Sequence, residues 1–145
     1  GWQYQRGETV FEQPAQIEGL GEVMLYGRLD RVDQNGERLA AIDYKTTDAS
    51  KLNKHLQNPG EHIQLPFYAW LADAAASYLP LGSDPMKTLE LDGETDVESI
   101  SLRLPELLAA IAAGAALPAN ATEDKCRYCE ARGLCRRGMW HDPTA

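Results

Sequence analysis

The chain has 145 residues, which fits one domain with a substantial hydrophobic core. Hydrophobic residues make up 43% and charged residues 25% of the sequence, and no apolar run approaches the ~20 residues of a membrane span. We therefore expect a soluble cytoplasmic protein with no membrane partner. The net charge of −8 argues against nucleic acid as a partner, although a short tail segment is locally basic.

The N-terminal part is predicted to contain little regular structure. Residues 1–8 show no hydrophobic period and are expected to form a loop, because neither strand nor helix spacing is present. Residues 9–13 are β-branched and aromatic and predict a short strand, which Pro14 should end. A turn is expected at 17–21.

A β-hairpin over 23–46 is the clearest element of the sequence. Asn35-Gly36 favours a two-residue type I′ loop, since both central positions need positive φ. Strands are then expected at 23–33 and 38–46, with Asp30 opposite Ala41. Two carboxylates and an ammonium should share one face of this hairpin: Asp30, Asp43 and Lys45. The opposite face should pack into the core through Leu25, Leu29 and Ile42.

Helices are expected on either side of a further strand. Residues 47–60 are polar and are predicted to form a connecting loop, whereas 61–79 are rich in helix formers and predict a helix with Pro66 near its start. Gln64 and Tyr68 would lie on one face of that helix because they are four residues apart. A second stripe should face the core: Ile63, Phe67, Trp70 and Ala74.

The remaining elements are shorter. Residues 86–91 predict a strand, and 97–102 predict another strand or the approach to a helix. A last helix over 105–117 is expected to begin at Pro105, which suits a first helical turn. These elements together predict a sheet core over 1–118 with flanking helices, an α/β (α+β) fold, and a tail over 119–145 that packs on this core.

The tail carries the only cysteines of the chain, Cys126, Cys129 and Cys135. The two-residue gap between the first pair lets both thiolates reach one metal ion. Three thiolates do not complete a four-ligand site, so either His141 completes a Zn²⁺ site or a cysteine outside this chain completes an iron-sulfur cluster. Three reduced cysteines without a metal are the remaining alternative.

These motifs, taken in order, resemble a known family. The segments GRLDRVD, IDYK and QLPFY, followed by the C-x2-C-x5-C tail, are similar to the RecB-type branch of the PD-(D/E)XK nucleases, above all to the C-terminal nuclease domain of AddB-like helicase-nuclease subunits. The resemblance spans most of the chain from Gly27 to Cys135. It implies a restriction-endonuclease-like fold and a DNA nuclease of repair and recombination that acts as an exonuclease. It also implies a helicase subunit or helicase domain as a partner.

The resemblance also assigns roles to individual residues. Asp30 and Asp43 would bind Mg²⁺ or Mn²⁺ together with the backbone carbonyl of Tyr44, and Lys45 would be the catalytic lysine. Gln64 and Tyr68 would contact DNA or orient the metal ligands. The three cysteines would hold an iron-sulfur cluster in the full-length parent. The family's fourth thiolate and a further metal-site acid or histidine precede the first strand, so we expect that this chain is truncated at its N-terminus and that the fragment lacks full activity.

Chemistry supports the same interpretation of the hairpin. Carboxylate-bound magnesium activates water for phosphodiester hydrolysis, and a neighbouring ammonium neutralises developing phosphate charge. A salt-bridge lattice that includes Arg28 would explain the same residues on an isolated hairpin. Two further hypotheses are a catalytically silent nuclease-like module that binds DNA or a partner, and a small zinc-binding interaction domain centred on the tail.

Overall fold

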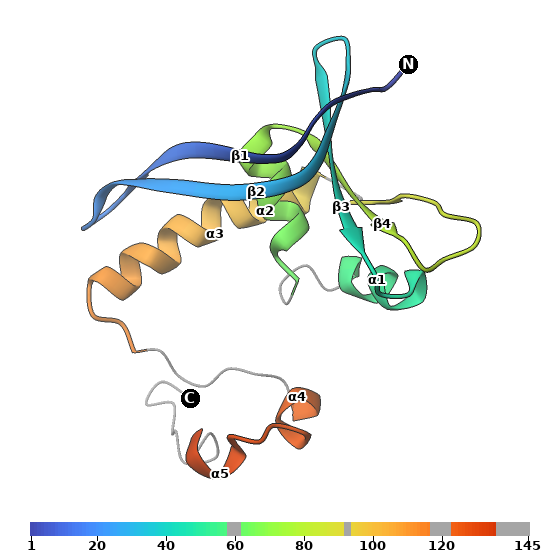
Figure 1. Cartoon of the computed structure of the whole chain (residues 1–145). Coiled ribbons are helices and arrows are strands. Elements are labelled where there is room, and N and C mark those ends of the chain that lie inside the picture. Colours follow the sequence, from blue (N-terminus) through green and yellow to red (C-terminus); the bar gives the residue numbers. More distant parts are fainter. Residues whose placement is uncertain (58–61, 92–93, 117–122, 136–145) are drawn as a thin grey trace. The chain divides into compact units, whose positions relative to one another are not determined.

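A computed structural model describes residues 1–57, 62–91, 94–116 and 123–135 (Figure 1). The chain divides into two compact units, Gly1–Ala109 and Ala110–Ala145. Five strands in the order β1-β2-β3-β4-β5 form one mixed sheet in the first unit, so the predicted α/β fold with flanking helices is confirmed. The elements are β1 (Gln3–Ile17), β2 (Gly21–Asn35), β3 (Arg38–Lys45), α1 (Ala49–Leu56), α2 (Gln64–Ala72), β4 (Ala75–Pro80), β5 (Leu89–Glu90), α3 (Glu94–Ala112), α4 (Glu123–Arg127) and α5 (Arg132–Cys135).

Strand β1 is much longer than predicted. It begins at Gln3, within the segment expected to be a loop, and continues through Pro14 to Ile17. Proline is tolerated here because β1 lies at the edge of the sheet and pairs only with β2, so one side of its backbone needs no ladder partner. The prediction of a strand ended by Pro14 was therefore wrong.

The hairpin between β2 and β3 has a different turn from the one predicted. Asn35 pairs with Arg38, so the two-residue loop is Gly36 and Glu37. Gly36 has a φ of 62° and occupies the first central position, where a type II′ turn places glycine. The register is displaced by two residues, with Val32 rather than Asp30 opposite Ala41. A shift of two leaves each side chain on its predicted face, because side chains alternate with a period of two.

The buried core includes residues from both predicted faces of the hairpin. Leu25 and Leu29, from the face expected to be apolar, and Val32 and Ala41, from the face expected to carry the acids, belong to one buried cluster. Burial along β2 therefore does not follow a single alternating set of side chains. Ile42 is only half-buried and lies outside the cluster. The prediction that one face alone packs into the core was therefore wrong.

The segment after β3 is a helix rather than the predicted loop. Leu52 and Leu56, four residues apart, lie on one face of α1, and Leu52 is 1% exposed. This spacing buries an apolar side of an otherwise polar helix. Figure 1 shows α1 beside the end of β3.

Helix α2 is shorter than the predicted helix over 61–79. It ends at Ala72, after which Asp73 adopts a left-handed conformation with φ of 47° and the chain turns into β4. β4 pairs in parallel with β3, and the pairing buries Ala76 and Tyr78. Tertiary burial thus overrides the helix propensity of the alanines. Of the predicted core stripe, Phe67, Trp70 and Ala74 are partly buried and pack against the core, whereas Ile63 is exposed. The fully buried residues of α2 are others: Leu65, Pro66, Ala69, Leu71 and Ala72.

Helix α3 contains Pro105 in its interior, although a helix beginning at this proline was predicted. The helix starts at Glu94, so the segment 97–102 is helical. Its last residue is Ala112, and Gly114, with φ of 87°, lies just beyond its end. There Ala115 N–H donates to Ala110 O at 2.9 Å, the bond that ends helices in a Schellman motif. The strand expected at 86–91 is reduced to the two residues of β5.

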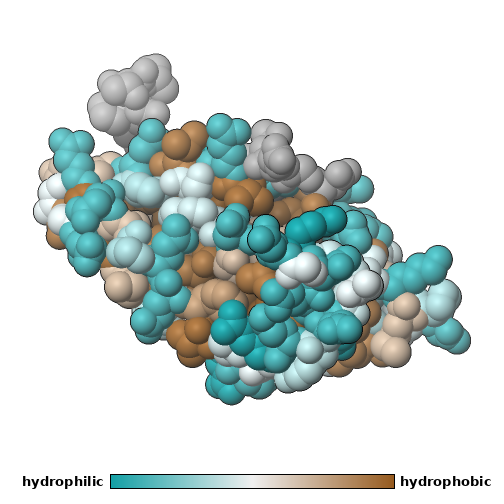
Figure 2. Space-filling view, turned by 90° about the horizontal axis from the view of Figure 1, so that it is seen from above, coloured by the Kyte–Doolittle hydropathy of each residue, from teal (hydrophilic) through white to brown (hydrophobic). Residues whose placement is uncertain are grey.

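The outer side of the β1–β2 hairpin leaves apolar residues exposed. Val10, Met24 and Tyr26 are 55%, 48% and 72% exposed. Figure 2 shows apolar residues among polar ones on the face seen from above. In the parts of the chain that the structure describes, no helix combines the length and apolar character needed to cross a membrane.

Candidate active site

Asp43 and Lys45 lie at the end of β3 and form the centre of the site. They are two residues apart on one strand, so their side chains leave the same face of the sheet. Asp43 is 4% exposed, and its Oδ2 lies 2.7 Å from Lys45 Nζ. A buried carboxylate is therefore paired with a half-buried ammonium.

Gln64 connects this pair to helix α2. Its Oε1 accepts a hydrogen bond from Lys45 Nζ at 2.9 Å, and its Nε2 donates to Asp43 Oδ1 at 3.0 Å. The same Nε2 also donates to Tyr68 Oη at 3.2 Å, one helical turn further along. The amide therefore fixes the ammonium and the carboxylate relative to each other and to the helix.

Gly27 allows α2 to approach the sheet closely at this point. A Cβ at Gly27 would lie 2.8 Å from Leu71 Cδ2 and 3.2 Å from Tyr68 Cε1. Only glycine leaves this space, so Gly27 positions the helix face that carries Gln64 and Tyr68. The sequence contained a signal for this role, because an isolated glycine in a strand often marks close backbone approach.

Asp30 reaches the site from β2 through the backbone of β3. Its Oδ2 accepts a hydrogen bond from Tyr44 N–H at 3.0 Å. Regular pairing of β2 with β3 ends at Arg31 and Ile42, so the carboxylate takes the acceptor position that a strand carbonyl would hold. The two strands separate here, and Asp30 lies in the opening.

The surroundings of Asp43 disfavour its charged form. Burial raises the pKa of this carboxyl, the hydrogen bond and charge of Lys45 oppose the change, and the negative charge of Asp30 adds to it. Burial also raises the pKa of Tyr78 to about 12, with smaller contributions from Asp43 and Tyr68, so its phenol stays protonated. A further positive charge at this site would therefore stabilise the charged forms of Asp30 and Asp43.

The donor atoms present fit a hard divalent cation. Asp43 Oδ2 is buried and lies 2.7 Å from Lys45 Nζ, whose ammonium also donates a hydrogen bond to Gln64 Oε1. Carboxylate oxygens are the ligands that Mg²⁺ takes in proteins. Within the ranges that the structure describes, no three His, Cys, Asp or Glu side chains are grouped so that they could hold a metal ion. The carboxylates with described contacts to Tyr44, Lys45 and Gln64 are those of Asp30 and Asp43.

The cysteine tail lies in the second unit. Cys126 is in α4 and Cys135 in α5, both half-buried, and Cys129 is exposed between the two helices. The three thiols are described residues and do not form a metal-holding group in this structure. His141 lies outside the described residues.

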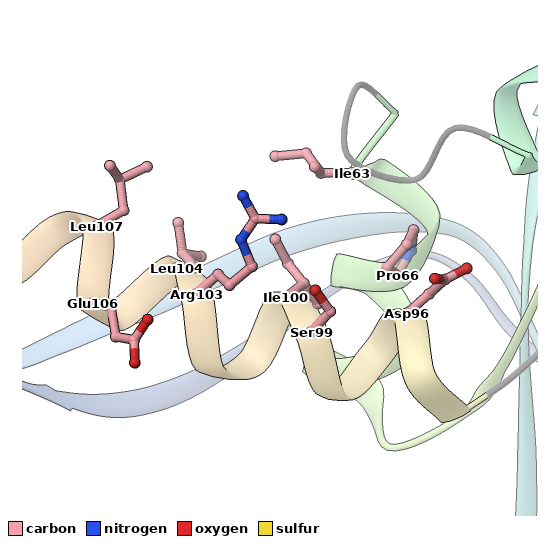
Figure 3. A pocket seen from close by; sticks show the side chains of 9 residues that line it. All are labelled: Ile63, Pro66, Asp96, Ser99, Ile100, Arg103, Leu104, Glu106 and Leu107. Carbon is pink, nitrogen blue, oxygen red and sulfur yellow. The ribbon is translucent and has the colours of Figure 1, made fainter. Parts of the chain in front are cut away.

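Two pockets border α2. The larger, a groove of about 600 Å³, is formed by the start of α2 and by α3 and contains none of the acids or the lysine discussed above (Figure 3). It is lined by Ile63, Pro66, Asp96, Ser99, Ile100, Arg103, Leu104, Glu106 and Leu107. The smaller, of about 480 Å³, adjoins Lys45 and Gln64. It brings in polar residues that the sequence did not single out as site residues: Thr47, His55, His62 and Tyr78.

Comparison with known proteins bears on the fold and on the family. The family model described as the PD-(D/E)XK nuclease superfamily matches residues 2–136. The crystal structure of SSO0001 is similar, with a TM-score of 0.56 and 20% identity over 90% of this chain. That likeness concerns the fold alone, and this chain spans 60% of the length of that one. No curated protein matches significantly.

Proposed function

Because the chain belongs to the PD-(D/E)XK nuclease superfamily, we propose that it is the nuclease domain of a DNA repair or recombination protein and hydrolyses phosphodiester bonds in DNA. Asp30, Asp43 and Lys45 are its catalytic residues. The observation that supports this most strongly is the network around Gln64, which holds a buried carboxylate and an ammonium side by side at an opening between two strands.

Asp30, Asp43 and the backbone carbonyl of Tyr44 would hold Mg²⁺ or Mn²⁺. The ion would supply a water that ionises near neutral pH and would offset charge on the phosphate. Burial of Asp43 favours this role, because a desolvated carboxylate gains more from a bound cation than one in water does.

Lys45 stabilises the negative charge that develops on the phosphate. Its ammonium is kept in place by Asp43 on one side and by Gln64 on the other, so little reorganisation is needed during the reaction. Gln64 and Tyr68 act as positioning residues, since their hydrogen bonds reach the carboxylate and the ammonium through the amide.

The order of the sequence motifs supports a more specific proposal about the type of nuclease, its partner and the metal in the tail. We infer a RecB-type exonuclease located in the cytoplasm, with a helicase subunit or a helicase domain of the same polypeptide as partner. The tail would pack on the core and hold an iron-sulfur cluster through Cys126, Cys129 and Cys135, with Zn²⁺ and His141 as the alternative. The grouping of three cysteines within ten residues supports a metal in the tail.

The decisive experiment compares wild-type protein with Lys45→Ala on linear DNA in Mg²⁺ and in Mn²⁺. We expect digestion by wild type and loss of at least 10²-fold in turnover for the variant, with DNA binding retained, since electrostatic stabilisation of the transition state is removed. Exposed Lys51→Ala is the matched control and should digest normally. Equal digestion by Lys45→Ala would reject the catalytic assignment.

One observation favours a second candidate, a catalytically silent module that binds DNA or a partner. The described residues bring two carboxylates, not three, to the site. This candidate predicts DNA binding without metal-dependent cleavage by wild type. The same digestion experiment therefore separates the two functions.

A further inference from the structure

The smaller pocket beside Lys45 has features that the hydrolytic site does not use. It is enclosed by the end of β3, helix α1, the residues that lead into α2, and strand β4. Its volume of about 480 Å³ lies within the range of small-molecule sites. Six of its lining residues are polar: Lys45, Thr47, His55, His62, Gln64 and Tyr78.

Two histidines form one wall of this pocket. The ring centroids of His55 and His62 are 3.7 Å apart and their planes differ by 18°, so the rings stack face to face. Imidazole lone pairs lie in the ring planes and here run parallel instead of converging, which does not suit a shared metal ion. No third His, Cys, Asp or Glu among the described residues joins them. Each imidazole instead carries a ring N–H that can act as a hydrogen-bond donor.

The charge around the pocket favours an anion. None of the described residues that line it is acidic, although Asp43 pairs with Lys45 at its edge and the chain has 22 acidic residues and a net charge of −8. Helix α1 likewise contains Lys51, Lys54 and His55 but no Asp or Glu. Tyr78 adds a phenol hydroxyl, and Lys45 Nζ lies 5.6 Å from the centre of its ring. Positive and hydrogen-bond-donating groups therefore line a cavity in an otherwise acidic protein.

We propose that this pocket is a phosphate-binding subsite in which the His55–His62 stack donates hydrogen bonds to a phosphate of the DNA strand next to the one that is cleaved. The proposal rests on the nuclease function, because Lys45 belongs to both sites and sets them side by side. The phosphate is either a terminal phosphate or the next internal one. The chemistry of recognition is the same for both, and the substrates below distinguish them.

The first test needs no DNA. Inorganic phosphate is titrated into the protein while the imidazole resonances are followed by ¹H–¹⁵N NMR. We expect saturable shifts of His55 and His62. Absence of shifts at His55 and His62 would overturn the proposal. Saturable shifts in a protein that never cleaves DNA would support phosphate binding in the pocket and reject the nuclease function. Failure of the phosphate subsite and failure of the nuclease function are therefore distinguishable.

The second test measures DNA binding without divalent ions, so that no cleavage occurs. Fluorescence anisotropy compares single-stranded oligonucleotides with a 5′-phosphate, a 3′-phosphate or neither, and a series with one uncharged methylphosphonate linkage at successive positions. Wild type should bind about tenfold more weakly when the recognised phosphate is removed, the effect of losing one hydrogen bond to a charged group. A terminal preference identifies an end phosphate, and a single sensitive linkage identifies an internal one.

His55→Ala should abolish that tenfold preference, and His62→Gln should reduce it. Lys51→Ala, a cation on α1 that does not line the pocket, is the control and should keep the preference while binding all oligonucleotides slightly more weakly. Circular dichroism establishes that each variant is folded, and two histidine variants guard against the misfolding of one. A preference that is absent in wild type, or unchanged in both histidine variants, would overturn the proposal.

Discussion

Replacing Gln64 by alanine tests how the two halves of the site are joined. The change removes three hydrogen bonds, two of them to charged groups: Lys45 Nζ at 2.9 Å, Asp43 Oδ1 at 3.0 Å and Tyr68 Oη at 3.2 Å. Bonds to charged groups contribute about 1.5–3 kcal/mol each and neutral ones about 0.5–1.5 kcal/mol. Because Lys45 is partly exposed and its ion pair with Asp43 survives, we expect less than the summed range of about 3.5–7.5 kcal/mol, a loss of about 2–4 kcal/mol in the free energy of unfolding.

Activity should change as well, since Gln64 orients groups that touch the substrate. Loss of such an orienting residue costs about 10–100-fold in activity or metal affinity. We expect a fall of this size in kcat with a smaller change in KM. Tyr68→Phe removes only one of the three bonds, so its effect on stability should be about 0.5–1.5 kcal/mol.

The assays are urea unfolding followed by circular dichroism and steady-state cleavage of linear DNA. Gln16→Ala is the matched control, because this exposed amide makes one long hydrogen bond of 3.4 Å to Glu22, and its removal should cost less than about 0.5 kcal/mol. If Gln64→Ala behaved like this control in both assays, the amide would not connect Asp43 to Lys45 in solution and our description of the site would be refuted.

Three further predictions follow from the same geometry. Burial holds the pKa of Asp43 above its unfolded value, so the charged carboxylate lowers the stability of the folded protein, and this loss is regained as the pH falls toward the unfolded pKa of about 3.9. The unfolding free energy of Asp43→Asn relative to wild type should therefore rise between pH 4 and pH 7, and the variant should not cleave DNA. A difference in unfolding free energy that does not depend on pH would contradict this. Gly27→Ala should lose about 1–3 kcal/mol in urea unfolding, because its Cβ would overlap Leu71, whereas Gly82→Ala, whose nearest contact would be 3.8 Å, should lose almost none; equal stability of the two variants would refute the close approach. Elemental analysis of the purified protein should find iron and acid-labile sulfide in similar amounts if the tail holds a cluster, one zinc if His141 completes the site, and neither if the thiols hold no metal.

Much of the site could be anticipated because it depends on local spacing. Asp43 and Lys45 share a face for any strand that contains both, and Gln64 and Tyr68 share a face for any helix that contains both. These relations hold whatever the rest of the chain does. The turn was predicted one residue too early, yet the facial assignment of Asp30 tolerated the resulting register error because that error was two residues.

The errors arose where long-range pairing outweighed local preference. The alanine-rich segment after Ala72 favours a helix by itself, but parallel pairing with β3 gives its backbone partners and buries Ala76 and Tyr78. Pro14 ends a strand in general and is accepted here because β1 is an edge. Neither outcome is encoded in the few residues that surround it.

The sequence by itself thus determined which polar residues share a face of each element and, through the order of its motifs, the PD-(D/E)XK nuclease superfamily. Only the tertiary structure decided that the amide of Gln64 joins Asp43 to Lys45, that the missing side chain of Gly27 admits α2, and that His55 stacks on His62 beside the lysine. The physical reason is that alternation and helical period act within a segment. Contacts between segments depend instead on which apolar surfaces are buried against each other, and this depends on how the whole chain packs its core.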